Sequence, residues 1–151
     1  MQKLLIALMA ALLMSGTASA SERTDVMSVV HEFIDGLNRN DEKAALAACA
    51  PETSIIDDFA PHVWNGPQAC NRWASDFDAD SSAQGVTDGI VTLLAPHRVD
   101  ITADRAYVVV RANYAYKLKG KPIHENGSTF TVALQKGKEG WRITAWAWSR
   151  S

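Results

Sequence analysis

Apolar residues follow two different spacings along this chain, and the change falls near its middle. Between Val26 and Leu37 they recur every three or four positions, as on a helix that buries one face. In the last third, for example at Phe130, Val132 and Leu134, they alternate with polar residues, as on a strand with one covered face. Helices followed by strands predict an α+β domain in which the helices cover one antiparallel sheet.

The helical half is expected to hold three helices. The first runs over about 24–38, and a second, short helix follows with Asn40 or Asp41 as its cap. The third helix opens with Pro67 at its first position, where a missing N–H costs nothing. It is expected to end before residues 78–85, whose small and polar side chains predict a loop.

The strand half is expected to form a meander. A short strand over 53–56 and a loop over 57–66, rich in acidic and aromatic residues, come before the third helix. Four longer strands follow it over about 89–101, 106–118, 125–136 and 141–149. The short, turn-like connections between these four strands imply antiparallel hairpins.

The last of these strands is apolar on both faces near its end. If its side chains alternate regularly, Trp146 and Trp148 lie opposite Ile143 and Ala145. This pattern indicates a second covered surface, which would be a pocket wall or a subunit interface.

The first twenty residues have the three parts of a secretory signal peptide. Lys3 precedes an apolar run over 4–14, and small residues then lead to Ala20. We expect cleavage after Ala20 and a periplasmic or secreted protein without stable membrane insertion after cleavage. An uncleaved membrane anchor is the alternative, although the apolar run is shorter than the roughly 20 residues that span a bilayer.

Removal of residues 1–20 would leave residues 21–151 as one domain. The whole chain carries a formal charge of −2, and the loss of Lys3 makes that of the remaining domain more negative. The basic residues are scattered, so nucleic acids and anionic membranes are not expected as partners. The chain also lacks the sequence motifs of serine hydrolases, P-loop proteins, dinucleotide-binding proteins and thioredoxins.

Two cysteines, Cys49 and Cys70, fall on predicted helices among apolar residues. We interpret them as two buried free thiols. A disulfide is the alternative, because an exported protein enters an oxidising compartment.

Several short segments carry a resemblance to a known family: Phe33–Leu37, Asn40-Asp41, Ala44–Ala50, Ser54–Asp57, Val63–Pro67 and Gly140–Ile143. In this order and spacing they make residues 24–149 similar to the nuclear transport factor 2-like (NTF2-like) superfamily, in its SnoaL-like and ketosteroid isomerase-like branches. The resemblance implies a cone, in which about three N-terminal helices pack on a curved antiparallel sheet and leave a pocket at the wide end. It implies no particular activity, since such folds include enzymes, binding modules and assembly domains.

The resemblance also places a steroid isomerase's catalytic groups on this chain. Its general base, an Asp just after the first short strand, falls at Asp57. Its two oxyanion donors, a Tyr and an Asp, fall at Phe33 and Val132, neither of which donates a hydrogen bond. Because one lost donor typically costs ~10²–10³ in rate, steroid isomerisation by that route is not expected.

Asp57 and His62 are the candidate catalytic residues. A carboxylate in an apolar pocket has a raised pKa and can act as a base, and His62 is close enough in sequence to assist. The alternative for Asp57 is a turn residue that hydrogen-bonds local backbone. No histidine pair has the spacing of a metal site, so we expect neither a metal nor a cofactor.

Aromatic residues provide the candidate walls of a ligand pocket. The expected lining consists of Phe33, Trp64, Trp73, His124, Trp146 and Trp148. Core packing and contacts within a homodimer are the alternatives for each of these rings.

Three functions follow from these features. The first is an exported SnoaL-like protein that binds a small apolar or aromatic molecule in its cone. The second is a cofactor-free lyase, isomerase or cyclase with Asp57 as general base, and the third is a structural dimerisation module.

Overall fold

The structure is a computed structural model that describes residues 2–151, with side chains from residue 20 onward. Over these residues it contains the helices α1 (Gln2–Asn38), α2 (Glu42–Ala47) and α3 (Ala69–Gln84). The strands are β1 (Cys49–Ile56), β2 (Val63–Pro67), β3 (Val86–Thr102), β4 (Arg105–Leu118), β5 (Lys121–Gly137) and β6 (Gly140–Ser149). The α+β prediction is thus confirmed.

The strands form one sheet in the order β2-β1-β6-β5-β4-β3. The predicted meander is confirmed, because β3 to β6 pair antiparallel with their neighbours in sequence. The expectation of a purely antiparallel sheet is wrong, because β1 pairs parallel with β6. These two strands are far apart in the chain, so no hairpin constrains their relative direction.

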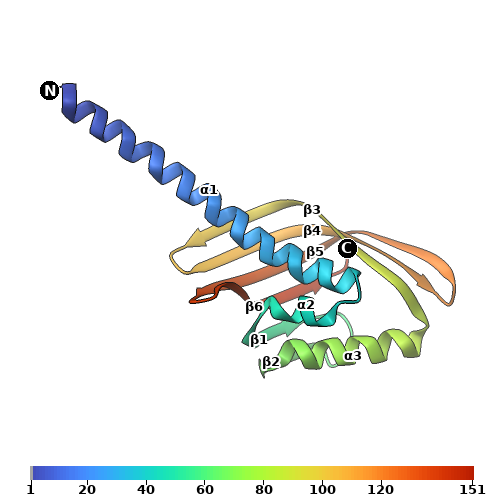
Figure 1. Cartoon of the computed structure of the whole chain (residues 1–151). Coiled ribbons are helices and arrows are strands. Elements are labelled where there is room, and N and C mark those ends of the chain that lie inside the picture. Colours follow the sequence, from blue (N-terminus) through green and yellow to red (C-terminus); the bar gives the residue numbers. More distant parts are fainter. Residues whose placement is uncertain (1) are drawn as a thin grey trace.

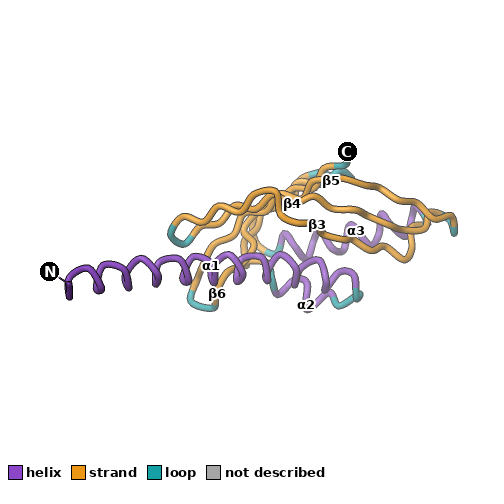
Figure 2. The backbone as a smooth tube through the Cα atoms, turned by 90° about the horizontal axis from the view of Figure 1, so that it is seen from above, coloured by secondary structure: helices purple, strands orange, loops and turns teal. Residues whose placement is uncertain are grey.

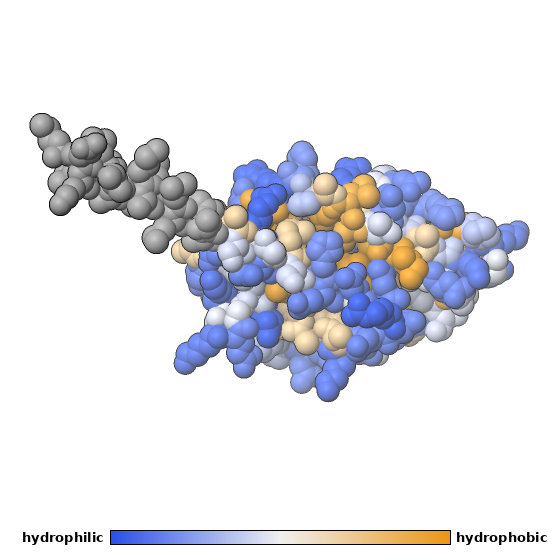
Figure 3. All heavy atoms as spheres, turned by 45° about the horizontal axis from the view of Figure 1, so that its top comes forward, coloured by the Kyte–Doolittle hydropathy of each residue, from blue (hydrophilic) through white to orange (hydrophobic). Residues whose placement is uncertain are grey.

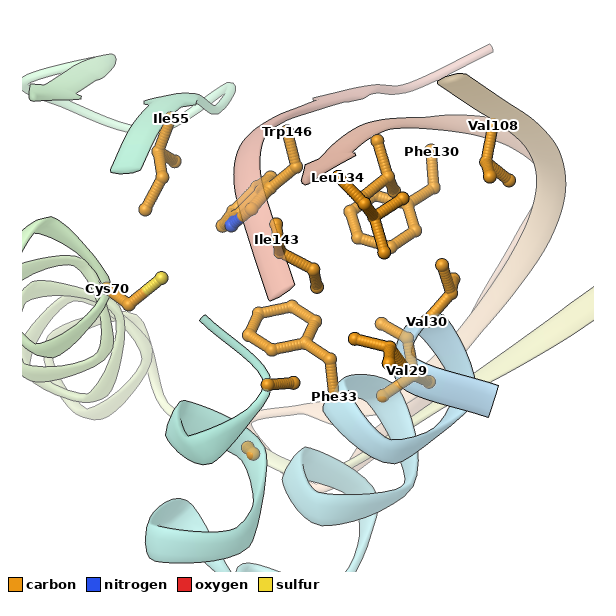
Figure 4. Packing of buried hydrophobic residues seen from close by; sticks show 14 of the residues in the cluster. Val29, Val30, Phe33, Ile55, Cys70, Val108, Phe130, Leu134, Ile143 and Trp146 are labelled. Carbon is orange, nitrogen blue, oxygen red and sulfur yellow. The ribbon is translucent and has the colours of Figure 1, made fainter. Parts of the chain in front are cut away.

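The helices gather on one side of the curved sheet, as Figures 1 and 2 show. The predicted apolar stripe of α1 is buried there at Val26, Val29, Val30, Phe33 and Ile34. Figure 4 shows Val29, Val30 and Phe33 pointing from α1 toward Phe130 and Ile143 of the sheet. The packing of this helical face against the sheet forms one part of the core, to which α3 adds Cys70 and Trp73.

The first helix is longer than the sequence pattern predicts, since α1 begins at Gln2 instead of about Thr24. The predicted signal peptide lies almost entirely outside the residues whose side chains are described, and it stays a prediction. Among the described residues, no helix has an apolar stretch long enough to cross a membrane.

The second helix begins as expected. Asp41 is its N-cap, and its side chain accepts a hydrogen bond from the backbone N–H of Ala44 at 3.0 Å. This cap fixes the turn between α1 and α2, where the backbone N–H of Asp41 also donates to the carbonyl of Gly36.

The segment between β1 and α3 differs from the prediction. The expected loop over 57–66 contains most of strand β2, which forms a hairpin with β1. Pro67 ends that strand instead of opening the helix, and α3 begins only after Gln68, whose φ is 54°. An edge strand tolerates a proline because one side of its backbone has no partner strand.

The third helix also continues further than expected, through the residues predicted as a loop to Gln84. Those residues are small and polar because they lie on the largely exposed side of the helix. Gly85 ends the helix in the left-handed region at φ 77°, and its N–H donates to the carbonyl of Ser82.

Strand β6 contains a β-bulge before the stretch in which alanines and tryptophans alternate. Its pairing with β5 shifts register between Ile143 and Ala145, so Thr144 is an extra residue in the ladder. As a result Trp141 and Ile143 before the bulge and Trp146 after it are all buried. The expected opposition of Trp146 and Ile143 is therefore wrong, because the bulge turns both toward the core.

Candidate functional site

A cavity of about 360 Å³ lies between the sheet, the C-terminal part of α1 and helix α3. Aromatic rings from five elements line it: Phe33, Trp73, Phe77, Tyr114, Phe130, Trp146 and Trp148. Trp73 and Trp146 meet edge to face with ring centroids 4.8 Å apart, and Phe33 lies within 6.2 Å of both Trp73 and Phe130. The shape and lining suit a small molecule with a flat apolar part.

The mouth of the cavity is held by a polar contact between α1 and β3. The side chain of Asn38 donates to the carbonyl of Val91 at 2.8 Å and accepts from the N–H of the same residue at 2.8 Å. Both Asn38 and Val91 line the cavity. This paired hydrogen bond fixes the end of α1 against the sheet edge.

Asp57 lies in the cavity wall directly after β1, and it is 8% exposed. Its Oδ2 accepts a hydrogen bond from Nε1 of Trp73 at 2.8 Å, and its Oδ1 accepts one from the backbone N–H of Asp58 at 2.8 Å. A carboxylate oxygen has two lone pairs, so each oxygen keeps one acceptor position for another group.

Burial raises the pKa of Asp57 from 3.8 to about 6, because removal from water penalises the charged form. The hydrogen bonds from Trp73 and from the Asp58 backbone act in the opposite direction and partly offset the effect of burial. A carboxylate with this pKa is mostly ionised at neutral pH, and it is a stronger base than an exposed aspartate.

Asp58 has quite different surroundings. Its carboxylate forms an ion pair with Arg150, whose guanidinium also contacts Oε1 of Glu125 at 3.0 Å. The hydroxyl of Tyr116 donates to the same Oε1 at 2.8 Å. The two neighbouring carboxylates thus differ in their surroundings. Asp58 forms an ion pair with Arg150 at the rim, whereas Asp57 faces the cavity.

Some residues that the sequence singled out do line this cavity. Phe33, Asp57, Trp73, Trp146 and Trp148 come together from α1, β1, α3 and β6. Their placement brings the candidate base and four of the predicted aromatic rings into one site.

The other predicted site residues lie elsewhere. Trp64 is buried against Phe59 outside the lining, and its Nε1 donates to Asp76 at 2.8 Å. His124 is exposed on β5. The structure therefore does not bring these two residues to the cavity.

His62 is exposed as well and belongs to the turn between β1 and β2. Its backbone carbonyl accepts from the N–H of Asp57, and its N–H donates to the carbonyl of Phe59. Its ring Nδ1 lies 3.1 Å from the backbone oxygen of Asp57, not from the carboxylate. Among the described residues, no histidine lines the cavity.

Several lining residues were missed by sequence reasoning, among them Phe77, Tyr114, Phe130 and Arg150. Phe130 and Tyr114 could have been proposed as lining residues, because each lies on the face of its predicted strand that carries the apolar side chains. Burial raises the pKa of Tyr114 to about 12, so its hydroxyl stays protonated. Arg150 lies beyond the last strand and gave no signal.

The two cysteines form a disulfide, so the interpretation as free thiols is wrong. Cys49 opens strand β1 instead of lying on a helix, and Cys70 lies in the first turn of α3, with Cα atoms 6.6 Å apart. The bond therefore joins β1, the strand that directly precedes Asp57, to the helix that carries Trp73.

No group of three or more His, Cys, Asp or Glu side chains within the described part of the chain is arranged to hold a metal ion. The chemistry that the cavity offers comes from aromatic surfaces, one phenol and carboxylates.

Solved structures share this fold at low sequence identity. A hexachlorocyclohexane dehydrochlorinase, LinA-type3, from Novosphingobium barchaimii is 11% identical, with a TM-score of 0.74 over 88% of this chain and 88% of that one. An NTF2-like superfamily protein from Salmonella enterica is 15% identical, with a TM-score of 0.73 over 87% and 92%. A ketosteroid isomerase-like protein from Erwinia carotovora is 18% identical, with a TM-score of 0.66 over 85% and 95%.

These likenesses establish an NTF2-like fold and do not transfer an activity. No curated protein matches the chain in sequence. The model of the SnoaL-like domain matches residues 26–150, which include every element from the buried part of α1 to the end of β6. The chain therefore belongs to the SnoaL-like domain family.

Proposed function

We propose that this protein binds a small molecule with a flat, apolar part in its cavity, and that Asp57 acts on the bound molecule as a general base. The reaction would be that of a cofactor-free lyase, isomerase or cyclase, which begins by removing a proton from carbon. The observation that carries the proposal is the buried carboxylate of Asp57 in an aromatic cavity. A dehydrochlorinase and an isomerase-like protein share the fold, which is consistent with proton abstraction but does not establish it.

Each step of this chemistry has a candidate group. The rings of Trp73, Trp146 and Phe33 would hold a flat substrate by apolar contact. Desolvation raises the basicity of Asp57, and its two hydrogen bonds hold the carboxylate in one orientation. Neither of the two donors of the steroid isomerase mechanism is present at Phe33 and Val132, so the proposal does not include that mechanism.

Proton removal can be tested without knowing the natural substrate. The purified protein is incubated in D₂O with a panel of cyclic enones and β-substituted carbonyl compounds, and deuterium uptake at carbon is followed by NMR. We expect exchange by the unaltered protein and a loss of ~10²–10⁴ in its rate with Asp57→Asn, the range typical of a general base. Asp35→Asn, on the exposed side of α1 and outside the cavity, is the matched control and should retain exchange.

Exchange that survives in the Asp57→Asn protein would contradict the role of the carboxylate. A second candidate function is binding without turnover, which is favoured by the hydrogen bonds that already occupy both carboxylate oxygens. Native mass spectrometry of protein recovered from its own compartment separates the two. A tightly held non-covalent mass together with no exchange in the panel would favour binding alone.

Export and dimerisation belong to the same proposal. The disulfide supports passage through an oxidising compartment, in agreement with the predicted signal peptide. Apolar side chains exposed on β3 and β4, namely Ile90, Leu94 and Tyr107, are consistent with a homodimer contact. Figure 3 shows that apolar residues gather on one part of the visible surface. Sedimentation velocity across a concentration series would test the dimer.

A further inference from the structure

The cavity carries more negative than positive charge. Five acidic residues line it: Glu42, Asp57, Asp58, Asp78 and Asp88. Arg150 is the one basic residue in the described lining, and its guanidinium is already engaged by Asp58 and Glu125. An anionic ligand would therefore meet several carboxylates and no basic group that is free to pair with it.

The carboxylate of Asp57 has no counter-ion. Asp58 is paired with Arg150 and Asp88 with Lys117, but Asp57 makes no ion pair within the described residues. A buried charge without a partner is costly, and proteins normally pair such a charge or neutralise it. The raised pKa of Asp57 has the same cause, because burial is its largest contribution and no basic group lowers it.

The aromatic walls are also suited to a positive charge. Trp73 and Phe77 stack with centroids 5.4 Å apart, and Trp146 meets Trp73 at a right angle. The face of an aromatic ring, and that of Trp most strongly, attracts a cation through its quadrupole. Trp73 meets Asp57 through its N–H edge, and the rings of Trp73, Phe77 and Trp146 line the same cavity at different angles.

We propose that the molecule bound in this cavity is an organic cation, in which a flat ring carries a protonated amine. The ring would contact the aromatic walls, and the ammonium group would supply the counter-ion that Asp57 lacks. This inference rests on the proposed small-molecule site and names the chemical class of its ligand. It does not require that the bound molecule be turned over.

The inference is tested with three probes that share one ring and differ in charge. At pH 7.5, 1-naphthylmethylamine is a cation, 1-naphthalenemethanol is neutral and 1-naphthoate is an anion. Isothermal titration calorimetry of the full chain gives the three dissociation constants. We expect the amine to bind about tenfold more tightly than the alcohol, and the carboxylate to bind more weakly than the alcohol.

Asp57→Asn keeps the size of the side chain and removes its charge. In this variant the preference for the amine over the alcohol should fall from about tenfold to near one. Asp78→Asn, at the cavity wall, should lower the preference by a smaller factor, and Asp35→Asn should leave it unchanged. Circular dichroism confirms that each variant is folded before titration.

The outcomes separate the inference from the proposed function. Equal binding of the amine and the alcohol, or tighter binding of the carboxylate, would overturn the organic-cation inference and leave a neutral small-molecule site intact. A preference that persists in Asp57→Asn would overturn the role of this carboxylate as the counter-ion. Absence of binding by all three probes would overturn the inference, while the deuterium-exchange experiment would still test the proposed function.

Discussion

The layer between α1 and the sheet has a filled half and a hollow half. The aliphatic side chains of Val30, Val108 and Ile143 are each 0% exposed. Around Trp73 and Trp146 the same layer contains the cavity of about 360 Å³. The comparison shows that α1 and the sheet bury a core along one part of their interface and, together with α3, enclose a cavity along another.

Side-chain shape accounts for the difference. Branched aliphatic groups interdigitate at the density of an organic crystal. Large rigid rings that meet edge to face, as Trp73 and Trp146 do, pack against one another along the cavity wall. The ring of Phe33 lies at the boundary, since it belongs to the core and also lines the cavity.

The largest expected effect comes from a change in the filled half. Ile143→Ala removes fully buried atoms from a region without spare space, and it should lower the free energy of unfolding by about 2–5 kcal/mol. Urea unfolding followed by circular dichroism measures the loss. Trp148→Ala, in the hollow half and only partly buried, should cost less. An equal cost for both variants would show that the two halves do not differ in packing.

The next effect concerns the disulfide between Cys49 and Cys70, which joins β1 to α3. Replacement of Cys49 and Cys70 by Ala, or reduction of the disulfide, should lower the free energy of unfolding by ~3 kcal/mol, since the bond closes a loop of 21 residues. We also expect weaker binding of the naphthalene probes, because the bond joins the elements that carry Asp57 and Trp73. Thermal unfolding with and without reductant tests the stability. Unchanged probe binding in the reduced, folded protein would show that the disulfide does not hold the site.

The smallest effect is a gain in stability. The pKa of Asp57 is raised to about 6 in the folded protein from 3.8, so protonation favours the folded state. This stabilisation is fully present below about pH 4 and is lost as the pH rises through 6, a loss of up to ~3 kcal/mol. Asp57→Asn escapes that loss but loses one of the two hydrogen bonds to the side chain, because an amide nitrogen cannot accept one.

We therefore expect Asp57→Asn to be about 1–2 kcal/mol more stable than the unaltered protein at pH 8 and no more stable at pH 4. Denaturant unfolding of both proteins at the two pH values measures the difference, in which the titration of all other groups cancels. A constant difference across this range would show that the carboxylate is not buried as a charge. A gain at pH 8 would mean that the candidate site is maintained at a cost to stability.

Much of the fold could be predicted from the sequence because its strongest patterns are long. The stripe from Val26 to Ile34 and the alternation at Phe130, Val132 and Leu134 repeat often enough to identify a helix face and a strand face. The errors fall where the pattern is short or depends on distant partners. Strand β2 has five residues and exists because β1 provides a ladder for it.

The candidate site could also be predicted only in part, because some of its contacts join residues that are distant in the sequence. Asp57, Phe33, Trp73 and two later tryptophans could be proposed from residue type and from the family resemblance. The ion pair of Arg150 with Asp58 joins residues far apart in the chain, and no local pattern encodes it. Proximity in sequence was misleading for His62, because the turn that brings it near Asp57 exposes its ring.

The extra residue at Thr144 has a consequence for how this chain can change. Successive side chains of a strand point to opposite faces of the sheet, and the bulge shifts this alternation by one residue between Ile143 and Trp146. Deletion of Thr144 would restore regular pairing and exchange the faces of every later residue in β6, turning Trp146 and Trp148 outward and placing alanines at the cavity wall. The loss of this one residue would thus replace an aromatic pocket wall with an exposed aromatic surface.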